Sequence, residues 1–220
     1  MLKLGLALIS VVICSAASAF VSESTTLKVL ATRGDFSNQL IPLAPLARWQ
    51  SPVKNIPVTS CYGPRRLLNK FADFHEGIDY GAATNTPVHA VASGKVLWTG
   101  FVGCSGHVII LQHRLKNRAV VYSLYKHLKN FVVKVGQQVR PGQMIAYSGS
   151  SGRQLLRSQE ASKRGCVIGP HLHVEFKLLR PGLTAGSVQE TVKRTRGHLS
   201  DMVMPMHPAL FIPELQGRCS

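Results

Sequence analysis

Two short stretches almost a hundred residues apart constrain the fold of this chain most: His75-Glu76-Gly77-Ile78-Asp79 and His171-Leu172-His173. Imidazole nitrogens and carboxylate oxygens are good ligands for a borderline-soft divalent ion. Two nitrogens and one oxygen form the protein ligand set of a catalytic zinc ion, whose fourth position stays open. We interpret the two stretches as halves of one metal site, so the fold must bring these distant segments side by side.

The spacing within each stretch predicts its local structure. On a straight strand His75 and Asp79 would lie about 13 Å apart, so the chain must bend between them, and Gly77 permits a bend. Histidines two apart lie on one face of a strand about 6 to 7 Å from each other, too far for both to bind one ion easily. We therefore expect one of His171 and His173 to bind the metal while the other faces the substrate.

The rest of the chain consists largely of short apolar runs separated by glycine and proline. This pattern is typical of an all-β domain, and we expect antiparallel sheets that form one compact domain with a cleft. A chain of 220 residues with 45% hydrophobic residues can bury one core. The expected strands are Val58–Tyr62, Ile78–Tyr80, Pro87–Ala90, Gly94–Thr99, His107–Gln112, Ala119–Tyr125, Met144–Ser148 and His171–Leu178.

Residues 1–19 are predicted to be a signal peptide. Lys3 supplies a positive charge, an apolar run extends from Leu4 to Cys14, and Ala17-Ser18-Ala19 forms a small-residue cleavage site. The apolar run is shorter than the roughly 20 residues of a membrane-spanning helix. The large residues before Cys14 disfavour a lipoprotein. The sequence therefore predicts a periplasmic or secreted protein.

The remaining chain divides into three parts. Residues 20–55 carry three prolines and are expected to form an extended lead-in that lies against the domain. A propeptide that covers the cleft is the sharper alternative for this lead-in. Residues 56–181 form the predicted domain, and residues 182–220 form a C-terminal extension whose apolar stretch, Met202–Pro213, is expected to pack back on the domain.

Charge is the strongest compositional anomaly, because 26 Lys and Arg residues against 10 Asp and Glu residues give a net charge of +16. Such a field attracts polyanions, and for an exported protein these are cell-wall polymers, anionic lipid headgroups or released nucleic acid. Solubility and general adhesion are the alternative explanation. The sequence has no helix-turn-helix pattern and no metal-finger spacing, so we do not expect it to bind nucleic acid in a sequence-specific way. We expect a monomer.

Removal of the signal peptide leaves four cysteines, Cys61, Cys104, Cys166 and Cys219. An even number in an exported chain predicts two disulfides, and four cysteines allow three pairings. None of the four has a Cys-x-x-Cys partner, which disfavours a cysteine zinc site.

Several further motifs accompany the two stretches. They are Cys61-Tyr62-Gly63-Pro64-Arg65, Thr86–Gly94, Tyr125-Lys126-His127-Leu128 and the Gly169-Pro170 pair directly before His171. Together and in this order they resemble the lysostaphin-type (LytM-like) zinc metalloendopeptidases, which cut peptide cross-links in bacterial peptidoglycan. The resemblance runs from about Ile56 to Lys177.

The resemblance implies a role for each residue of the site. It implies that His75, Asp79 and His173 bind one zinc ion per chain. It also implies that His127 and His171 are catalytic histidines, which flank the reacting carbonyl without binding the metal. We favour His171 as the base and His127 as the group that stabilises the oxyanion, with the exchanged assignment as the alternative.

The implied function is that of a secreted zinc-dependent endopeptidase acting on peptidoglycan peptides. The alternative is a non-catalytic cell-wall-binding protein or amidase activator on the same fold. Such a non-catalytic protein would be expected to lack some of the metal-binding residues, whereas all five site residues are present here. A carboxypeptidase that trims terminal D-alanine is disfavoured, because that related group has a wider spacing between its first histidine and aspartate.

The chain departs from the family pattern at residues 153–168, an insertion with four basic residues and one acid. A basic wall near the cleft and a solvated loop are both open interpretations of this insertion. The resemblance places Cys104 and Cys166 in loops at the rim of the cleft. This favours a disulfide between them and leaves Cys61 to pair with Cys219.

The sequence also predicts the surroundings of two further residues, His113 and Glu175. His113 ends an apolar run and is expected at the surface of a strand end, with a place in the cleft as the alternative. Glu175 alternates with His171 and His173 on one strand face, so it either orients a ligand or pairs with a basic neighbour. We favour the pairing.

Overall fold

The computed structural model describes residues 26–28, 40–42, 49–67, 70–116, 118–152, 169–199 and 201–215. The predicted signal peptide, the insertion at 153–168, Cys166 and Cys219 lie outside these residues, so the expectations for them stay predictions. No helix within the described ranges is long and apolar enough to cross a membrane.

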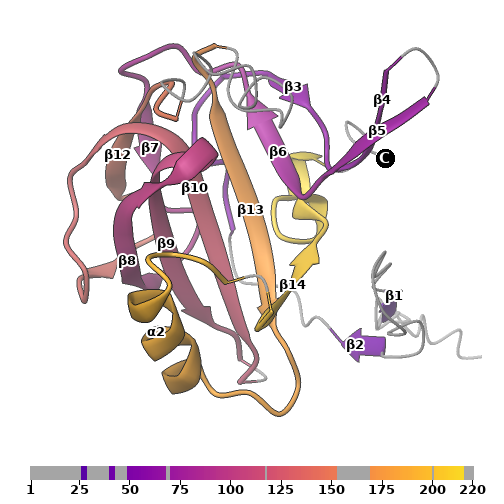
Figure 1. Cartoon of the computed structure of the whole chain (residues 1–220), viewed down its shortest axis with the longest axis vertical. Coiled ribbons are helices and arrows are strands. Elements are labelled where there is room, and N and C mark those ends of the chain that lie inside the picture. The colour runs from indigo at the N-terminus through magenta and orange to yellow at the C-terminus, as the bar shows by residue number, and fades with distance from the viewer. Residues whose placement is uncertain are drawn as a thin grey trace, which may run out of the picture.

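An antiparallel sheet of ten strands dominates the fold (Figure 1). Its strands follow the order β11-β8-β9-β10-β13-β6-β3, while β12 joins β10 to β7 and β14 pairs with β13. The expected all-β fold with antiparallel sheets is thus confirmed. The strands are β3 (Val58–Ser60), β6 (Gly77–Tyr80), β7 (Pro87–His89), β8 (Gly94–Val102), β9 (Gly106–Arg114), β10 (Val120–Phe131), β11 (Gln138–Val139), β12 (Met144–Ser148), β13 (Leu172–Leu179) and β14 (Val203–Met206).

Smaller elements accompany this sheet. Two hairpins pair β1 with β2 and β4 with β5, and one α-helix and three short 3-10 helices complete the described elements. Their bounds are β1 (Thr26–Lys28), β2 (Leu40–Pro42), β4 (Gly63–Leu67), β5 (Lys70–His75), η1 (Gly103–Ser105), α2 (Ala185–Arg194), η3 (Pro208–Leu210) and η4 (Pro213–Leu215).

Strand β13 is the element that assembles the distant parts of the chain. One of its edges pairs with β10, and its other edge is shared by β6 along the first half and β14 along the second half. In this register His173 lies opposite Lys126 on one side and opposite Asp79 on the other. Strand pairing therefore brings the two stretches of the predicted site together.

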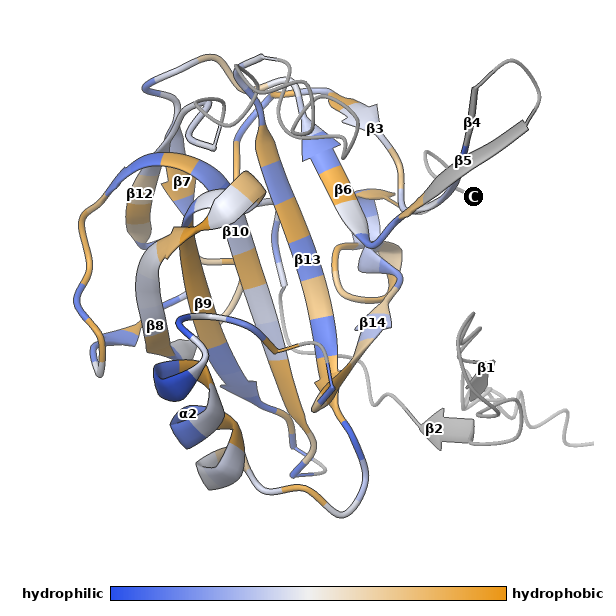
Figure 2. Cartoon of the chain, viewed as in Figure 1, coloured by the Kyte–Doolittle hydropathy of each residue, from blue (hydrophilic) through white to orange (hydrophobic). Residues whose placement is uncertain are grey.

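The two faces of the sheet carry different side chains, because successive residues of a strand point to opposite faces. Figure 2 shows the resulting alternation of hydrophobic and hydrophilic residues along β13. Its residues Val174 and Phe176 point into the larger core, together with Tyr125 of β10. On the opposite face, Tyr122 and Leu124 belong to a second, smaller apolar cluster.

Helix α2 covers this second cluster. Thr184 caps the helix, since its hydroxyl accepts a hydrogen bond from the Ser187 backbone N–H and the Ser187 side chain accepts one in return. Val188 and Val192, four residues apart on one side of the helix, are fully buried in the cluster. This stretch belongs to the C-terminal extension expected from the sequence, for which no helix was predicted.

Residues from both predicted extensions belong to the larger core. Trp49 and Val53 of the lead-in are buried in it, as are Phe211 and Ile212 of the C-terminal extension. The packing of the apolar stretch at 202–213 against the domain, expected from the sequence, is therefore observed.

The expectation that His113 lies at the surface is wrong. The residue is 1% exposed and belongs to a buried hydrogen-bonded chain. Its Nδ1 lies 2.8 Å from the Ser93 carbonyl oxygen, and its Nε2 lies 2.7 Å from the Ser123 hydroxyl. The oxygen of that hydroxyl also lies 3.2 Å from the Tyr125 oxygen. Burial lowers the pKa of His113 to about 4, so the ring is neutral at pH 7.

Candidate metal centre and catalytic histidines

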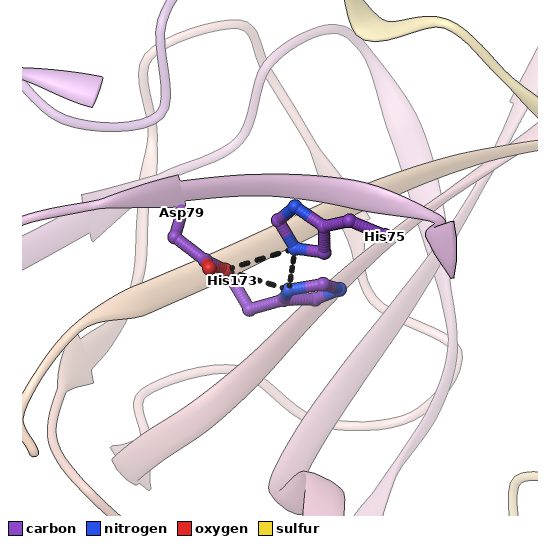
Figure 3. Close-up of side chains that lie close together, drawn as sticks. All are labelled: His75, Asp79 and His173. Atoms are coloured by element: carbon purple, nitrogen blue, oxygen red, sulfur yellow. Dashed lines mark hydrogen bonds and ion pairs between the residues drawn. The ribbon is translucent and has the colours of Figure 1, made fainter. Parts of the chain in front are cut away.

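Three ligand atoms converge at one point, as Figure 3 shows. His75 Nε2 lies 3.0 Å from His173 Nδ1, His173 Nδ1 lies 2.8 Å from Asp79 Oδ1, and His75 Nε2 lies 3.2 Å from the same oxygen. Zinc bonds of about 2.0 to 2.2 Å in tetrahedral geometry place ligand atoms about 3.3 Å from one another. The arrangement therefore fits a zinc ion with a small outward relaxation of the side chains.

The other polar atom of each of these side chains is held by the protein. His75 Nδ1 donates to the Cys61 carbonyl oxygen at 2.7 Å. Asp79 Oδ2 accepts a hydrogen bond from Arg65 at 2.9 Å, and His173 Nε2 lies 2.9 Å from a Glu175 oxygen. Because a carbonyl or carboxylate oxygen can only accept, these bonds place the ring protons on the outer nitrogens. Such contacts orient metal ligands and fix their tautomers.

Gly77 contributes to the centre by a close approach between two strands. A Cβ atom at this position would lie 2.5 Å from the Val174 carbonyl oxygen and 2.7 Å from His173 Nε2. Any side chain here would push β6 away from β13 and separate Asp79 from His173. The glycine between His75 and Asp79 thus lets the two strands pair closely enough to form the centre.

Burial and charge favour a carboxylate at Asp79. Burial alone would raise the pKa of Asp79, but the neighbouring His173 and His75 outweigh it and hold this pKa well below its ordinary value. His75, Asp79 and His173 are all buried. A negative charge beside two imidazoles, shielded from solvent, is a suitable environment for a divalent cation.

His127 and His171 lie beside this centre, as the sequence predicted, with ring centroids 4.6 Å apart. His171 directly precedes β13, and its Nε2 lies 3.8 Å from Asp79 Oδ1. His171 Nδ1 donates to the Gly169 carbonyl oxygen at 3.0 Å, and His127 Nδ1 lies 3.3 Å from the Ser151 carbonyl oxygen. The five residues singled out from the sequence therefore form one cluster.

The backbone of His127 is unusual. Its φ of 61° lies in the left-handed region, which few residues other than glycine adopt, and the register of β10 against β9 shifts between Tyr125 and Leu128. Such a bulge re-aims a side chain relative to a regular strand. Burial, followed by the neighbouring His171 and His173, lowers the pKa of His127 to about 3, so this ring is neutral at pH 7.

The structure shows contacts around the centre that go beyond those expected from the sequence. Arg65 was quoted within a motif, but its bond to Asp79 was not anticipated. Glu175 contacts both Lys126 and Lys177, which confirms the favoured pairing with basic neighbours, and it also contacts His173. The spacing of two residues between His173 and Glu175 was the one sequence signal for the contact between them.

Comparison with known proteins places the chain in a family. The family model described as Peptidase family M23 matches residues 73–199, which is more than half of the chain. The chain therefore belongs to peptidase family M23. The matched segment contains all five site residues, and the resemblance to lysostaphin-type metalloendopeptidases is confirmed.

Curated relatives share part of their length with this chain. The peptidoglycan DD-endopeptidase ShyC of Vibrio cholerae is 29% identical over 164 residues, which cover 73% of this chain and 34% of ShyC. The peptidoglycan DD-endopeptidase ShyA of the same organism is 33% identical over 54% of this chain and 24% of ShyA. The glycyl-glycine endopeptidase ALE-1 of Staphylococcus capitis is 36% identical over 52% of this chain and 27% of ALE-1. The chain spans about a third or less of each relative.

Solved structures also match parts of this chain. A zinc-containing peptidase from Vibrio cholerae matches with a TM-score of 0.49 and 27% identity, over 60% of this chain and 37% of that one. The catalytic domain of lysostaphin from Staphylococcus simulans matches with a TM-score of 0.47 and 25% identity, over 74% of this chain and 94% of that one.

Proposed function

We propose that the chain is an exported zinc-dependent endopeptidase that hydrolyses peptide cross-links of bacterial peptidoglycan. The observation that carries the proposal is the convergence of His75 Nε2, Asp79 Oδ1 and His173 Nδ1 within 3.2 Å of one another. Membership of peptidase family M23 supports it. The proposed ligands are His75, Asp79 and His173, which would hold one zinc ion per chain.

The chemistry proposed for the centre is hydrolysis of a peptide bond. When bound, zinc supplies Lewis acidity toward a carbonyl oxygen and toward water. His171 is proposed as the base, because its Nδ1–H donates to Gly169 and leaves the Nε2 lone pair to take a proton from the attacking water. The same nitrogen then returns the proton to the leaving amine.

His127 is proposed to stabilise the oxyanion. A pKa lowered to about 3 makes it a weak base, which supports giving the basic role to His171. To donate a hydrogen bond to the oxyanion, neutral His127 must carry its proton on Nε2. The contact of its Nδ1 with the Ser151 carbonyl oxygen, 3.3 Å long, is the one that this tautomer gives up.

Features of the chain outside the centre extend the proposal to additional partners, export and disulfides. The net charge of +16 favours anionic cell-wall polymers as additional partners. Export rests on the signal-peptide pattern of residues 1–19, and an oxidising compartment would allow the two expected disulfides, Cys104 with Cys166 and Cys61 with Cys219.

The test is digestion of purified muropeptides, followed by mass spectrometry of the products with and without a chelator. We expect cross-linked muropeptides to lose peptide cross-links in the untreated sample, and the chelated sample to stay intact until zinc is restored. Binding of muropeptides without any cleavage would favour a non-catalytic wall-binding protein. Release of terminal D-alanine alone would instead indicate a carboxypeptidase.

A further inference from the structure

We propose that Glu175 is a positioning residue, held in place by Lys126 and Lys177, which keeps His173 oriented with Nδ1 toward the metal. This inference rests on the proposed function, because it takes His173 as a zinc ligand. It adds a layer of charged residues around the centre and assigns that layer to metal binding.

The contact between His173 and Glu175 fixes the ring. The two residues are two apart on β13 and therefore share one face of the sheet. A Glu175 oxygen lies 2.9 Å from His173 Nε2, and a carboxylate can only accept a hydrogen bond. The ring proton is thus on Nε2, and the lone pair is on Nδ1, the atom that faces His75 and Asp79. A flip of the ring would exchange these two nitrogens and remove the ligand atom from the centre.

The carboxylate of Glu175 is itself held at both oxygens. The Lys126 ammonium contacts Oε1, the oxygen that also faces His173. The Lys177 ammonium lies 3.1 Å from Oε2. Lys126 comes from β10, directly opposite His173, and Lys177 lies two residues further along β13. Contacts from two strands therefore leave Glu175 little freedom to turn away from His173.

A further ion pair extends the layer to the segment that carries His75. Lys177 lies 2.5 Å from an oxygen of Glu76, the residue that follows the ligand His75. The chain of contacts thus runs from β10 through β13 to the segment that enters β6. Two lysines and two glutamates thus connect β10 and β13 to the residue between β5 and β6.

Burial distinguishes the pair of Glu175 and Lys177 from ordinary surface ion pairs. Glu175 is 4% exposed and Lys177 is 6% exposed. Buried charge pairs give little net stability, because the cost of desolvation offsets their attraction. Stability alone therefore does not account for charges at these positions, whereas the orientation of a metal ligand requires an acceptor at the place where Glu175 stands.

The test is zinc affinity, measured on the full mature chain by competition with a chromophoric chelator. Thermal unfolding of the metal-free protein is recorded in parallel. We expect Glu175→Ala to weaken zinc binding by about 10- to 100-fold. Glu175→Gln keeps a carbonyl acceptor for His173 and should recover part of this loss. The matched control is Glu190→Gln, which removes an exposed glutamate that pairs with Lys193 on α2 and should leave zinc affinity unchanged.

A double variant guards against loss of folding. Glu175→Gln with Lys177→Met removes one buried charge of each sign and keeps the acceptor, so it should fold and bind zinc more tightly than Glu175→Ala with Lys177→Met. Nitrogen-15 spectra of the His173 ring should show the Nε2–H tautomer in the wild type and in the acceptor-retaining variants. Equal zinc affinity with and without the acceptor would overturn the proposal. Absence of zinc binding by the wild type would instead overturn the proposed function.

Discussion

His113 and His173 are both buried histidines of the same sheet, but they point to opposite faces and use their ring nitrogens differently. His113 directs both nitrogens to protein groups, the Ser93 carbonyl and the Ser123 hydroxyl. His173 directs one nitrogen to Glu175, while the other meets a nitrogen of His75 and an oxygen of Asp79.

The difference shows what separates a structural histidine from the proposed metal ligand. Burial does not separate them, since His113 is 1% exposed and His173 is 8% exposed. At His113 each ring nitrogen has one complementary partner, so the hydrogen bonding is complete. At His173 several lone pairs point at one place, and a cation is the partner that satisfies them all.

The largest effect that tests this comparison is loss of the metal. The wild-type chain should contain close to one zinc ion, and alanine at His75, Asp79 or His173 should abolish both zinc content and activity because a catalytic site needs all three ligands. Metal analysis of the purified variants measures this. His113→Gln is the control and should keep its zinc. Stoichiometric zinc in a His75→Ala, Asp79→Ala double variant would refute the ligand assignment.

The next effect separates chemistry from ligation. His127→Ala and His171→Ala should keep zinc and fold, while turnover of cross-linked muropeptides should fall by about a hundredfold or more, as expected for an acid-base or oxyanion group. Kinetic assays with metal analysis of the same samples measure both quantities. If His171→Ala lost zinc while His173→Ala kept it, the roles of these two residues would have to be exchanged.

A third effect concerns acid stability. The unfolded His113 side chain takes up a proton below about pH 6.5, whereas the folded one resists protonation until pH falls to about 4. Acid therefore favours the unfolded state, and the contribution of His113 is lost as pH falls from about 6.5 to 4, by about 3 kcal/mol in total. Denaturant unfolding of the metal-free chain at several pH values measures it, with His113→Gln as the variant that should lack this component. An identical pH profile for both proteins would contradict the assignment.

The smallest effect is expected from a single hydrogen bond. Ser123→Ala leaves His113 Nε2 without its partner and should lower the free energy of unfolding by about 1 to 2 kcal/mol. Zinc affinity should stay unchanged, because Ser123 lies on the other face of the sheet. Ser60→Ala is a useful comparison, since its hydroxyl lies 3.3 Å from the ligand His75. A change in zinc affinity in the Ser123 variant, with none in the Ser60 variant, would reverse the comparison.

Much of this molecule was predictable from local patterns. All eight expected strands correspond to strands of the sheet, because alternation and glycine or proline boundaries mark half-buried strands well. The closeness of the five residues singled out was predictable because the motifs around them matched a family, and the structure places them in one cluster.

The parts that were missed depend on contacts between distant residues. Helix α2 buries two valines in a polar segment, too weak a pattern to indicate a helix. Lys126 and Lys177 were overlooked as parts of the centre because lysine is usually exposed, and only strand pairing brings them to Glu175. His113 was misjudged because a histidine at the end of an apolar run carries no local sign of what will cover it.

The shared edge of β13 has a practical consequence for anyone who shortens this chain. The family motifs end near Lys177, so a cut at Pro181 looks natural from the sequence. Such a cut would remove β14, which pairs with Phe176–Leu179, and the helix that covers the second cluster. An uncovered strand edge beside exposed apolar residues is a template for pairing between molecules. A truncated protein would therefore be expected to aggregate during expression, even though all five residues of the centre were intact.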